Sequence, residues 1–330
     1  MAAVSRLRDW GLLLTCNLIW GTQFVFVKVV QREMGPLFAT LFPLGLTVLI
    51  LVPLVKRQDH GDGLDQRPAK IPGRDLIDFL FLGVLGQAVT MLFGTWGIRL
   101  TLASDAALFN LALPVTTAVM AYFLLDERMT IIRVVSFVLA IVGVLECSGI
   151  NFHGLSFSGP EILLGNLFCF ISVVGSAFYN AYSKTLLARY SVLRVVLYTD
   201  GIAFLVLLPF AIYLEPQSFR NFFHFSLFAW VCLLFLALLR NLLALVLFLH
   251  VLKRLDATVV GLSNYLIPFF GVLTAAMFLG EKFTAYMFVG GFLVLCSTLL
   301  TTISDGRQIR KSAVPADGVT SEKAWPESKK

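Results

Sequence analysis

Arg240 is the residue best placed to do chemistry, because it is an ionisable side chain inside a long apolar stretch. It lies about 14 residues into that stretch, which puts it about 20 Å along a helix and near the middle of a bilayer. A charge at that depth is costly and therefore predicts a function. Its planar guanidinium suits a carboxylate or a phosphate. The alternative is a structural ion pair with Asp200, and the sequence leaves both open.

Lys28 is the second intramembrane cation, close to the end of the first apolar stretch. A lysine at that depth can extend its ammonium to the membrane interface, which would be a structural role. Binding an anionic group of a substrate, or carrying a proton, are the other interpretations.

Six amide side chains lie inside the apolar stretches and are also costly in lipid. They should face the protein interior, where they either line a substrate site or bond one helix to another. The aromatic residues Trp20 and Tyr265 could stack on a substrate or simply pack. The amides are Gln23, Gln87, Asn110, Asn180, Asn241 and Asn264.

Motifs for other chemistry are missing from the sequence. No phosphate-binding GxxxxGK[ST] loop occurs, so direct use of ATP is not expected, and no HExxH metal motif occurs. We therefore expect no metal, no cofactor and no enzymatic activity. The alternative is a membrane-embedded enzyme acting on a lipid or isoprenoid, which would need clustered His, Asp or Glu residues at one membrane face.

Composition indicates the solvent in which these residues must fold. Hydrophobic residues make up 58% of the chain, charged residues 14%, and the mean hydropathy is +0.85. Soluble domains are closer to 45–50% apolar and about 25% charged, so lipid must surround most of this chain. The net charge of +6 is then better explained by basic loops than by a nucleic-acid partner.

Ten stretches are long and apolar enough to cross a bilayer, for which a helix needs about 20 residues. We therefore predict an all-α integral membrane protein with ten transmembrane helices. The stretches cover roughly residues 10–30, 36–55, 76–97, 103–125, 131–150, 161–184, 194–214, 226–250, 258–280 and 284–303.

Lysines and arginines are concentrated before the first stretch and after each even-numbered one. Because basic residues favour the cytoplasmic side, this bias predicts a multi-pass protein of the cell membrane with both termini in the cytoplasm. The polar segment 304–330 is expected to be a disordered cytoplasmic tail.

An internal repeat relates the two halves of the chain. At an offset of 154 positions, Asn110 corresponds to Asn264, Pro114 to Pro268 and Glu127 to Glu281. Each unit, residues 10–150 and 161–303, holds five spans. Because five is odd, the second unit must be inverted relative to the first, as in many secondary transporters.

The paired residues have expected structural roles. Glu127 and Glu281 lie at helix ends, where a carboxylate can accept bonds from terminal amides. Pro114 and Pro268 lie inside spans and should kink them. Ser104 and Thr258 precede the same spans and are predicted to cap them.

Two segments resemble a known family. The first span contains NLIWGTQFVFVK at residues 17–28, and each block of small residues, proline, alanine and an apolar run ends at Glu127 or Glu281. Over about residues 10–303 the chain resembles the EamA family of the drug/metabolite transporter superfamily. The resemblance implies ten helices, and a central cavity lined mainly by the first, third and fourth helix of each repeat. The second copy departs from the pattern, with Val174 where Trp20 would fall.

We therefore expect a secondary-active exporter or exchanger of a small polar metabolite, such as an amino acid or organic acid, working by alternating access. Its partners would be the small-molecule substrate and the lipid bilayer.

Overall fold

The structure is a computed structural model of the whole chain. Four predicted features lie outside the residues it describes: Glu127, Thr258, Tyr265 and segment 304–330. The described residues are 2–61, 71–125, 131–147, 159–254, 263–264, 266–281, 285–286, 288–293, 295–297 and 299–300.

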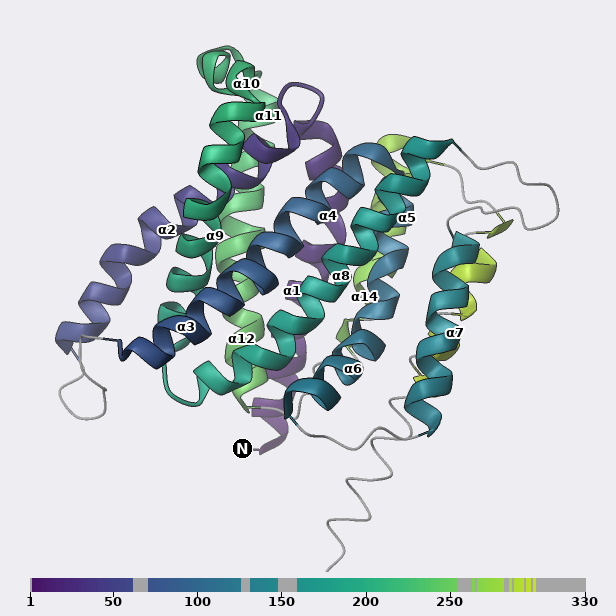
Figure 1. Cartoon of the computed structure of the whole chain (residues 1–330), viewed down its shortest axis with the longest axis horizontal. Coiled ribbons are helices and arrows are strands. Elements are labelled where there is room, and N and C mark those ends of the chain that lie inside the picture. Colours follow the sequence, from purple (N-terminus) through teal and green to yellow (C-terminus); the bar gives the residue numbers. More distant parts are fainter. Residues whose placement is uncertain are drawn as a thin grey trace, which may run out of the picture.

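The described part of the first half is a series of helices (Figure 1). Several spans consist of consecutive segments with different helical geometry. The segments are α1 (Ala2–Val30), α2 (Pro36–Gly61), α3 (Gly73–Phe81), η1 (Leu82–Ala88), α4 (Val89–Leu100), α5 (Ala103–Phe109), η2 (Asn110–Ala112), α6 (Leu113–Leu125) and α7 (Ile131–Cys147).

The described part of the second half is also helical. Its segments are α8 (Pro160–Leu187), α9 (Val192–Leu214), α10 (Pro216–Arg220), η3 (Phe222–His224), α11 (Leu227–Leu234), η4 (Phe235–Ala244), α12 (Leu245–Arg254) and α14 (Leu266–Leu279).

Among the described residues, seven continuous helical stretches are long and apolar enough to cross a membrane, and each overlaps a predicted span. Shorter apolar helices cover Leu266–Leu279 and Phe288–Ser297, and α7 has 17 residues. The chain is therefore an all-helical, multi-pass membrane protein. The seven stretches are Arg8–Val30, Pro36–Gln58, Gly73–Leu100, Ala103–Leu124, Pro160–Leu187, Val192–Leu214 and Leu227–Lys253.

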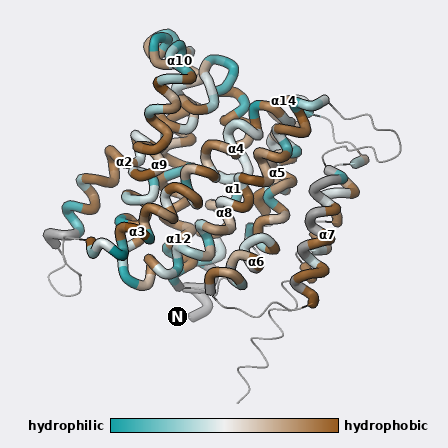
Figure 2. Tube along the Cα trace, in the orientation of Figure 1, coloured by the Kyte–Doolittle hydropathy of each residue, from teal (hydrophilic) through white to brown (hydrophobic). Residues whose placement is uncertain are grey.

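The outward surface of these helices is apolar. Phe123 is 71% exposed, and Ile131 and Leu227 are also among the large hydrophobic residues that face outward. Figure 2 shows hydrophobic residues along most of each helix and hydrophilic ones gathered near α10 and the start of α3. Burying this surface in lipid removes the cost of exposing it to water.

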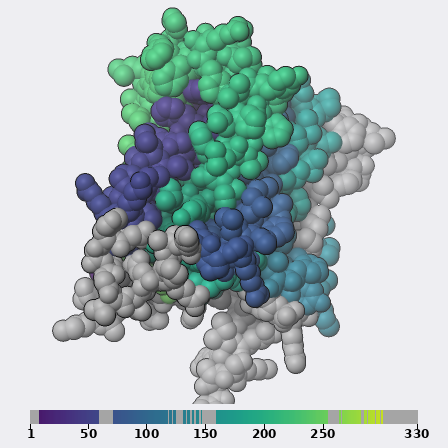
Figure 3. Space-filling model, turned by 60° about the vertical axis from the view of Figure 1, so that its left-hand side comes forward, coloured from purple at the N-terminus to yellow at the C-terminus, as the bar shows by residue number. Residues whose placement is uncertain are grey.

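The two halves pack against each other across the whole bundle. Helix α1 lies against α14, and α4 against α8. Helix α9 packs between α2 and the third helix of the first half, which Figure 3 shows as a green band between purple and blue. A Cβ added at Gly97 would lie 2.5 Å from the Cys169 sulfur and 2.9 Å from the Gly165 carbonyl oxygen. Such small residues let membrane helices approach closely.

The third membrane-crossing helix of each half contains a π-helical segment. Segment η1 joins α3 to α4, and η4 joins α11 to α12. In a π-helix the backbone bonds reach one residue further than in an α-helix, which turns the following side chains, and such segments are frequent at functional sites. Nothing in the sequence predicted them.

The end of the bundle that carries α10, here named the Glu215 end, is held by carboxylates on helix N-termini. Glu215 accepts bonds from the amides of Leu37 at 3.0 Å and Phe38 at 2.9 Å. Glu281 accepts from the amides of Ala103 and Ser104 at 3.0 and 2.9 Å. The prediction that Ser104 caps this helix is wrong, because Ser104 lies within α5 and its hydroxyl donates to Glu281.

The opposite end, here named the Arg189 end, is held by an ion-pair cluster. Arg189 donates to Asp75 and, at 2.8 Å, to Asp78 at the start of α3. The Tyr182 hydroxyl donates to Asp78 at 2.7 Å. The hydrogen bond with Asp78 raises the pKa of the Arg189 guanidinium above its ordinary value, so the guanidinium stays charged. The cluster joins the first half to the second.

The two paired prolines differ in their places. Pro114 lies inside the continuous stretch Ala103–Leu124, as the second residue of α6 after the 3₁₀ segment η2, and Pro268 is the third residue of α14. A proline in the first turn of a helix, such as Pro268, removes no intrahelical bond, because the first amides have no partner there. Around Pro114 the expected kink takes the form of a change in helical geometry.

Candidate substrate site

A partly open cavity of about 110 Å³ lies between the two halves of the chain. Its described lining comes from α1, η1, α4, η2 and α6 of the first half, and from α8, η4, α12, Asn264 and α14 of the second. The lining residues are Trp20, Gln23, Gln87, Thr90, Met91, Asn110, Leu113, Ser176, Tyr179, Asn180, Arg240, Asn241, Leu245, Phe248, Asn264 and Ile267.

Eight of the ten residues proposed from the sequence as substrate contacts belong to this lining. Of the other two, Tyr265 lies outside the described residues and Lys28 is not in the lining. The eight are Trp20, Gln23, Gln87, Asn110, Asn180, Arg240, Asn241 and Asn264.

The Arg240 guanidinium is held by first-half and second-half side chains. Its Nε donates to Gln23 Oε1 at 2.5 Å, and its Nη1 donates to Asn241 Oδ1 at 2.7 Å and lies 2.7 Å from the Met91 sulfur. Its Nη2 has no hydrogen-bond partner among the described residues. The Nε and Nη1 side of the guanidinium is therefore fixed, while Nη2 remains available to an anion in the cavity.

Arg240 and Asp200 interact electrostatically, but no nitrogen–oxygen pair within 4.0 Å joins them in the described structure. Instead, Gln87 donates from Nε2 to Asp200 Oδ1 at 2.6 Å. The direct ion pair considered from the sequence is therefore absent between these two described residues. Arg240 lines the cavity, whereas Asp200 is fully buried behind Gln87.

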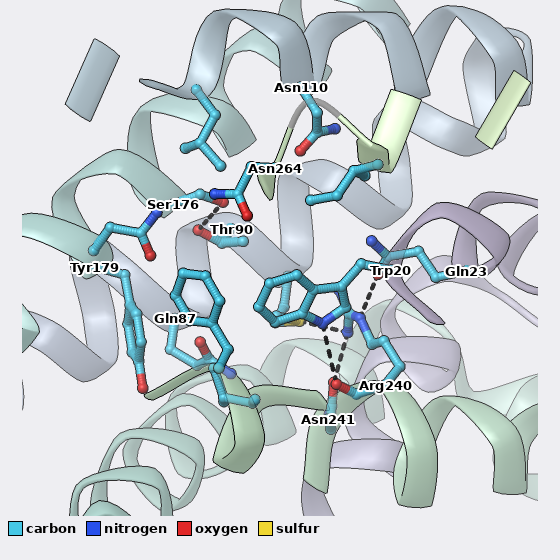
Figure 4. Close-up of a pocket in the computed structure, with 16 residues that line it drawn as sticks. Trp20, Gln23, Gln87, Thr90, Asn110, Ser176, Tyr179, Arg240, Asn241 and Asn264 are labelled. Carbon is cyan, nitrogen blue, oxygen red and sulfur yellow. Dashed lines mark hydrogen bonds between the residues drawn. The ribbon is translucent and has the colours of Figure 1, made fainter. Parts of the chain in front are cut away.

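Trp20 forms part of an aromatic wall close to Arg240. Its indole Nε1 donates to the Arg240 carbonyl oxygen at 3.4 Å, and its ring centroid lies 4.9 Å from that of Phe248. Figure 4 shows the Trp20 ring in the middle of the lining, with Arg240 and Asn241 below it and Asn110 and Asn264 above. An apolar part of a ligand could pack on this wall while its charged part reaches Arg240.

Two buried amides have polar atoms that need a partner. Asn241 Nδ2 and Asn264 Oδ1 make no hydrogen bond to the described residues. An unpaired buried polar atom is costly, so such atoms are candidates for bonds to a ligand or to water. They supply one donor and one acceptor on the second-half side of the cavity.

The π-helical segments position the polar lining. Gln87 belongs to η1, and Arg240 and Asn241 belong to η4. The wider turn of a π-helix lets adjacent residues 240 and 241 both contribute to one cavity.

Lys28 has structural partners away from the cavity lining. Its ammonium donates to the carbonyl oxygens of Ile98 at 2.7 Å, Arg99 at 3.3 Å and Thr101 at 2.5 Å. These are carbonyls at the carboxyl end of α4, which lack intrahelical partners and carry partial negative charge. Lys28 therefore closes this helix end in the observed conformation.

Half of the lining was not identified from the sequence. Thr90 and Ser176 were missed because a Ser or Thr hydroxyl can bond to its own helix and so gives little signal in lipid, and Tyr179 because its ring is largely apolar. The remaining ones are apolar and resemble any other membrane-helix residue: Met91, Leu113, Leu245, Phe248 and Ile267.

The described lining contains one cation, several amides and an apolar wall. In the part of the chain that the structure describes, no three His, Cys, Asp or Glu residues are grouped to hold a metal ion. This set of groups can bind and orient a small molecule with an anionic group, and it suits binding better than bond-breaking chemistry.

The fold has a solved counterpart. A crystal structure matches this one with a TM-score of 0.59 over 91% of this chain and 98% of its own, at 15% sequence identity. At that identity the likeness concerns the fold alone.

Two curated relatives are named as transporters. The uncharacterized transporter YetK of Bacillus subtilis is 26% identical over 68% of this chain and 66% of its own length. A protein of Streptantibioticus cattleyicolor named as a probable terminal-alkyne amino-acid exporter is 25% identical over 93% of this chain and 97% of its own.

The model of the EamA-like transporter family matches the chain twice, at residues 10–148 and 163–303. Two matches in one chain agree with the internal repeat found at an offset of 154 positions. The relatives are transporters, so the enzymatic alternative does not hold. This chain belongs to the EamA-like transporter family and is a membrane transporter of a small molecule.

Proposed function

We propose that this transporter is a secondary-active exporter or exchanger of a small polar metabolite that carries a carboxylate, such as an amino acid or organic acid. The observation that carries the proposal is the Arg240 guanidinium, which lines the cavity with Nη2 unpartnered among the described residues. A planar guanidinium binds a carboxylate better than any other side chain does.

The transport cycle proposed is alternating access by two inverted units, residues 10–150 and 161–303, with five spans each. The matching π-helical segments η1 and η4 support this division, as does a cavity that lies between the halves. Inverted units can exchange conformations of similar energy, and each conformation opens the cavity to one side of the membrane.

The proposed orientation has both termini in the cytoplasm of a cell-membrane protein, with 304–330 as a cytoplasmic tail. The Arg189 end then faces the cytoplasm and the Glu215 end faces outward. The lysines and arginines of the intervening loops support this assignment.

The proposed substrate contacts are Arg240 for the carboxylate, Trp20 for the apolar part of the molecule, and the amides for its remaining polar groups. Asn264 Oδ1 has no hydrogen-bond partner among the described residues and could accept from an ammonium or hydroxyl group. The relative named as an amino-acid exporter favours an amino acid over an organic acid.

The proposal is tested with purified protein in liposomes loaded with one unlabelled compound and supplied with its radiolabelled form outside. A panel of L-threonine, L-phenylalanine, L-glutamate, pyruvate, lactate, succinate and glucose separates the classes. Counterflow of at least one carboxylate, and not of glucose, is expected. Failure of every carboxylate to move, or movement of glucose alone, would reject the proposal.

The conservative variant Arg240→Lys tests the planar contact. Lysine keeps the charge but offers one nitrogen rather than a fork, so the KM for the transported carboxylate should rise while folding is kept. An unchanged KM would remove Arg240 from the substrate site.

A further inference from the structure

Asp200 is a fully buried carboxyl group that the proposed transport cycle has not used. It lies in α9, about 12 Å along the helix from its first residue by helical rise, and so inside the membrane-spanning part. Its Oδ1 accepts from Gln87 at 2.6 Å, and its Oδ2 has no hydrogen-bond partner among the described residues.

The groups that face Asp200 come from three elements packed near it. Gln87 of η1 bonds to it, while Arg240 of η4 and Tyr179 of α8 interact with it electrostatically. Tyr179 is itself close to Thr199, whose hydroxyl lies 3.4 Å from the phenol oxygen.

Other charged groups on neighbouring elements lie far along their helices. Helices α2, α3 and α12 have theirs at the Arg189 end, and α10 has Arg220 at the Glu215 end. Those at the Arg189 end are Lys56, Arg57, Arg74, Asp75, Asp78 and Lys253. On α9 itself, Arg194 lies six residues before Asp200, about 9 Å along the helix. Among the described cations, Arg240 is the one whose charge acts on Asp200.

A buried carboxylate with one bare oxygen is unstable unless a cation pairs with it or a proton neutralises it. Arg240 does not supply that pairing in the observed structure, because no nitrogen–oxygen pair within 4.0 Å joins these two described residues. The observed geometry is thus the one expected for a neutral carboxylic acid at position 200. An acid at that position leaves Arg240 as the uncompensated positive charge facing the cavity.

We propose that Asp200 is the proton-binding site of this transporter and that it couples proton movement to carboxylate transport through Arg240. The inference rests on the proposed function. When Asp200 holds a proton on Oδ2, the substrate carboxylate neutralises Arg240 and the site carries no net charge. When Asp200 is ionised, Arg240 is already balanced and a bound carboxylate would leave one negative charge inside the membrane, which is costly.

Proton binding and carboxylate binding therefore favour each other, as reciprocal linkage requires. One proton enters Asp200 from the same side as the carboxylate, and both leave on the other side. The loaded carrier is neutral at this site, so proton and carboxylate move in the same direction. Exchange of one carboxylate for another does not require Asp200 to lose its proton.

The proton site is tested without a substrate by infrared difference spectroscopy of the purified wild type and Asp200→Asn in lipid nanodiscs, titrated with pH alone. A protonated carboxyl has a C=O stretch that an ionised one lacks. As pH rises, the wild type should lose one band that Asp200→Asn lacks, beside any band from Asp105, whose Oδ1 is also without a described partner. Asp105→Asn, which removes another buried aspartate, should keep the Asp200 band. Identical pH-dependent bands in the wild type and Asp200→Asn would overturn the proposal.

The coupling is tested in proteoliposomes with the first carboxylate of the panel that the wild type exchanges. Acidifying the side that holds the carboxylate should accelerate wild-type net uptake about tenfold per pH unit at most, the limit for one proton. In Asp200→Asn the ratio of gradient-driven uptake to exchange should fall severalfold, and in Asp105→Asn it should not change. Wild-type transport that ignores the pH gradient would reject the coupling while leaving the transport function intact.

If no panel compound moves, the proposed function fails, and the infrared titration still decides whether Asp200 binds a proton. The two failures are therefore distinguishable. If the Asp200 band titrates normally but the pH gradient does not drive transport, Asp200 binds a proton without coupling it to carboxylate transport.

Discussion

Gly86 and Arg240 lie 154 positions apart, at matching places in the π-helical segments η1 and η4. A Cβ at Gly86 would already lie 3.1 Å from the Tyr179 ring, so that side of the cavity is filled by a neighbour. The other side has a guanidinium held by two amides. Both halves keep the irregular helix, but only one keeps a charge. The irregular helix therefore belongs to the shared scaffold, whereas we propose that the charge serves substrate recognition.

The next matching pair of residues in η1 and η4 also differs between the two halves, but in its hydrogen-bond partners rather than in its side-chain type. Gln87 and Asn241 are both buried amides, but Gln87 donates to Asp200 whereas Asn241 accepts from Arg240. Equivalent positions thus both carry an amide, but the amide bonds to an acid in one half and to a cation in the other. Five variants, in four predictions, would break or sharpen this comparison.

Arg240→Ala should have the largest effect on transport. Loss of a charge-assisted bond to a carboxylate costs about 1.5–3 kcal/mol, which corresponds to a roughly 10- to 100-fold fall in kcat/KM. Radiolabelled counterflow in liposomes measures this fall. The control is circular dichroism of the purified variant, which should keep the wild-type helical content. Counterflow within twofold of the wild type would show that the asymmetry between Gly86 and Arg240 has no functional meaning.

Gln87→Ala should destabilise the protein more than Asn241→Ala does. Without Gln87, Asp200 Oδ1 loses its described partner and neither oxygen of this fully buried carboxyl is hydrogen-bonded to a described residue, at a cost of about 1–3 kcal/mol. Asn241→Ala removes one of several contacts to Arg240 and should cost about 1 kcal/mol. Thermal unfolding of the two variants in the same detergent compares them. A reversed order would mean that Arg240, and not Asp200, is the group that depends on its amide.

Lys28→Gln should lower stability by about 1 kcal/mol and leave the KM of transport unchanged. The lysine donates to carbonyl oxygens at the end of α4 and is not part of the described cavity lining. Unfolding temperature and counterflow measured on the same preparation separate the two roles. A raised KM with wild-type stability would indicate that Lys28 contacts the substrate, as proposed for Arg240.

Gly86→Ala should have the smallest effect. The added methyl group must push the Tyr179 ring by a few tenths of an ångström, which costs at most about 1 kcal/mol where the ring can move. Transport should stay within about twofold of the wild type. The comparison with Arg240→Ala uses the same helix position in the other half, so equal losses of counterflow would contradict the division into scaffold and recognition positions.

The central polar residues could be predicted from the sequence because lipid makes them conspicuous. An arginine or asparagine inside an apolar stretch must find a partner or a cavity, and Arg240, Asn241 and Asn264 all line one. Hydropathy also located the helices, because only regular, internally bonded segments can cross a bilayer.

Other features depend on packing between distant segments and left no sequence signal. The π-helical geometry of η1 and η4 is set by how neighbouring helices fit, not by local residue preference. Lys28 looked equivalent to Arg240 as an intramembrane cation, but the turn after α4 brings three carbonyl oxygens to it. The cap on α5 was assigned to the nearby Ser104, whereas a residue far along the chain, Glu281, provides it.

The carboxylates at the Glu215 end have a consequence for assembly. Glu215 and Glu281 belong to the second half of the chain, but the amides they bind begin α2 and α5 of the first half. A first half synthesised alone would expose helix ends that it cannot satisfy by itself. We therefore expect each half to fold poorly without the other. If the gene were split between them, each fragment should be degraded when expressed singly and persist when both are produced in the same cell.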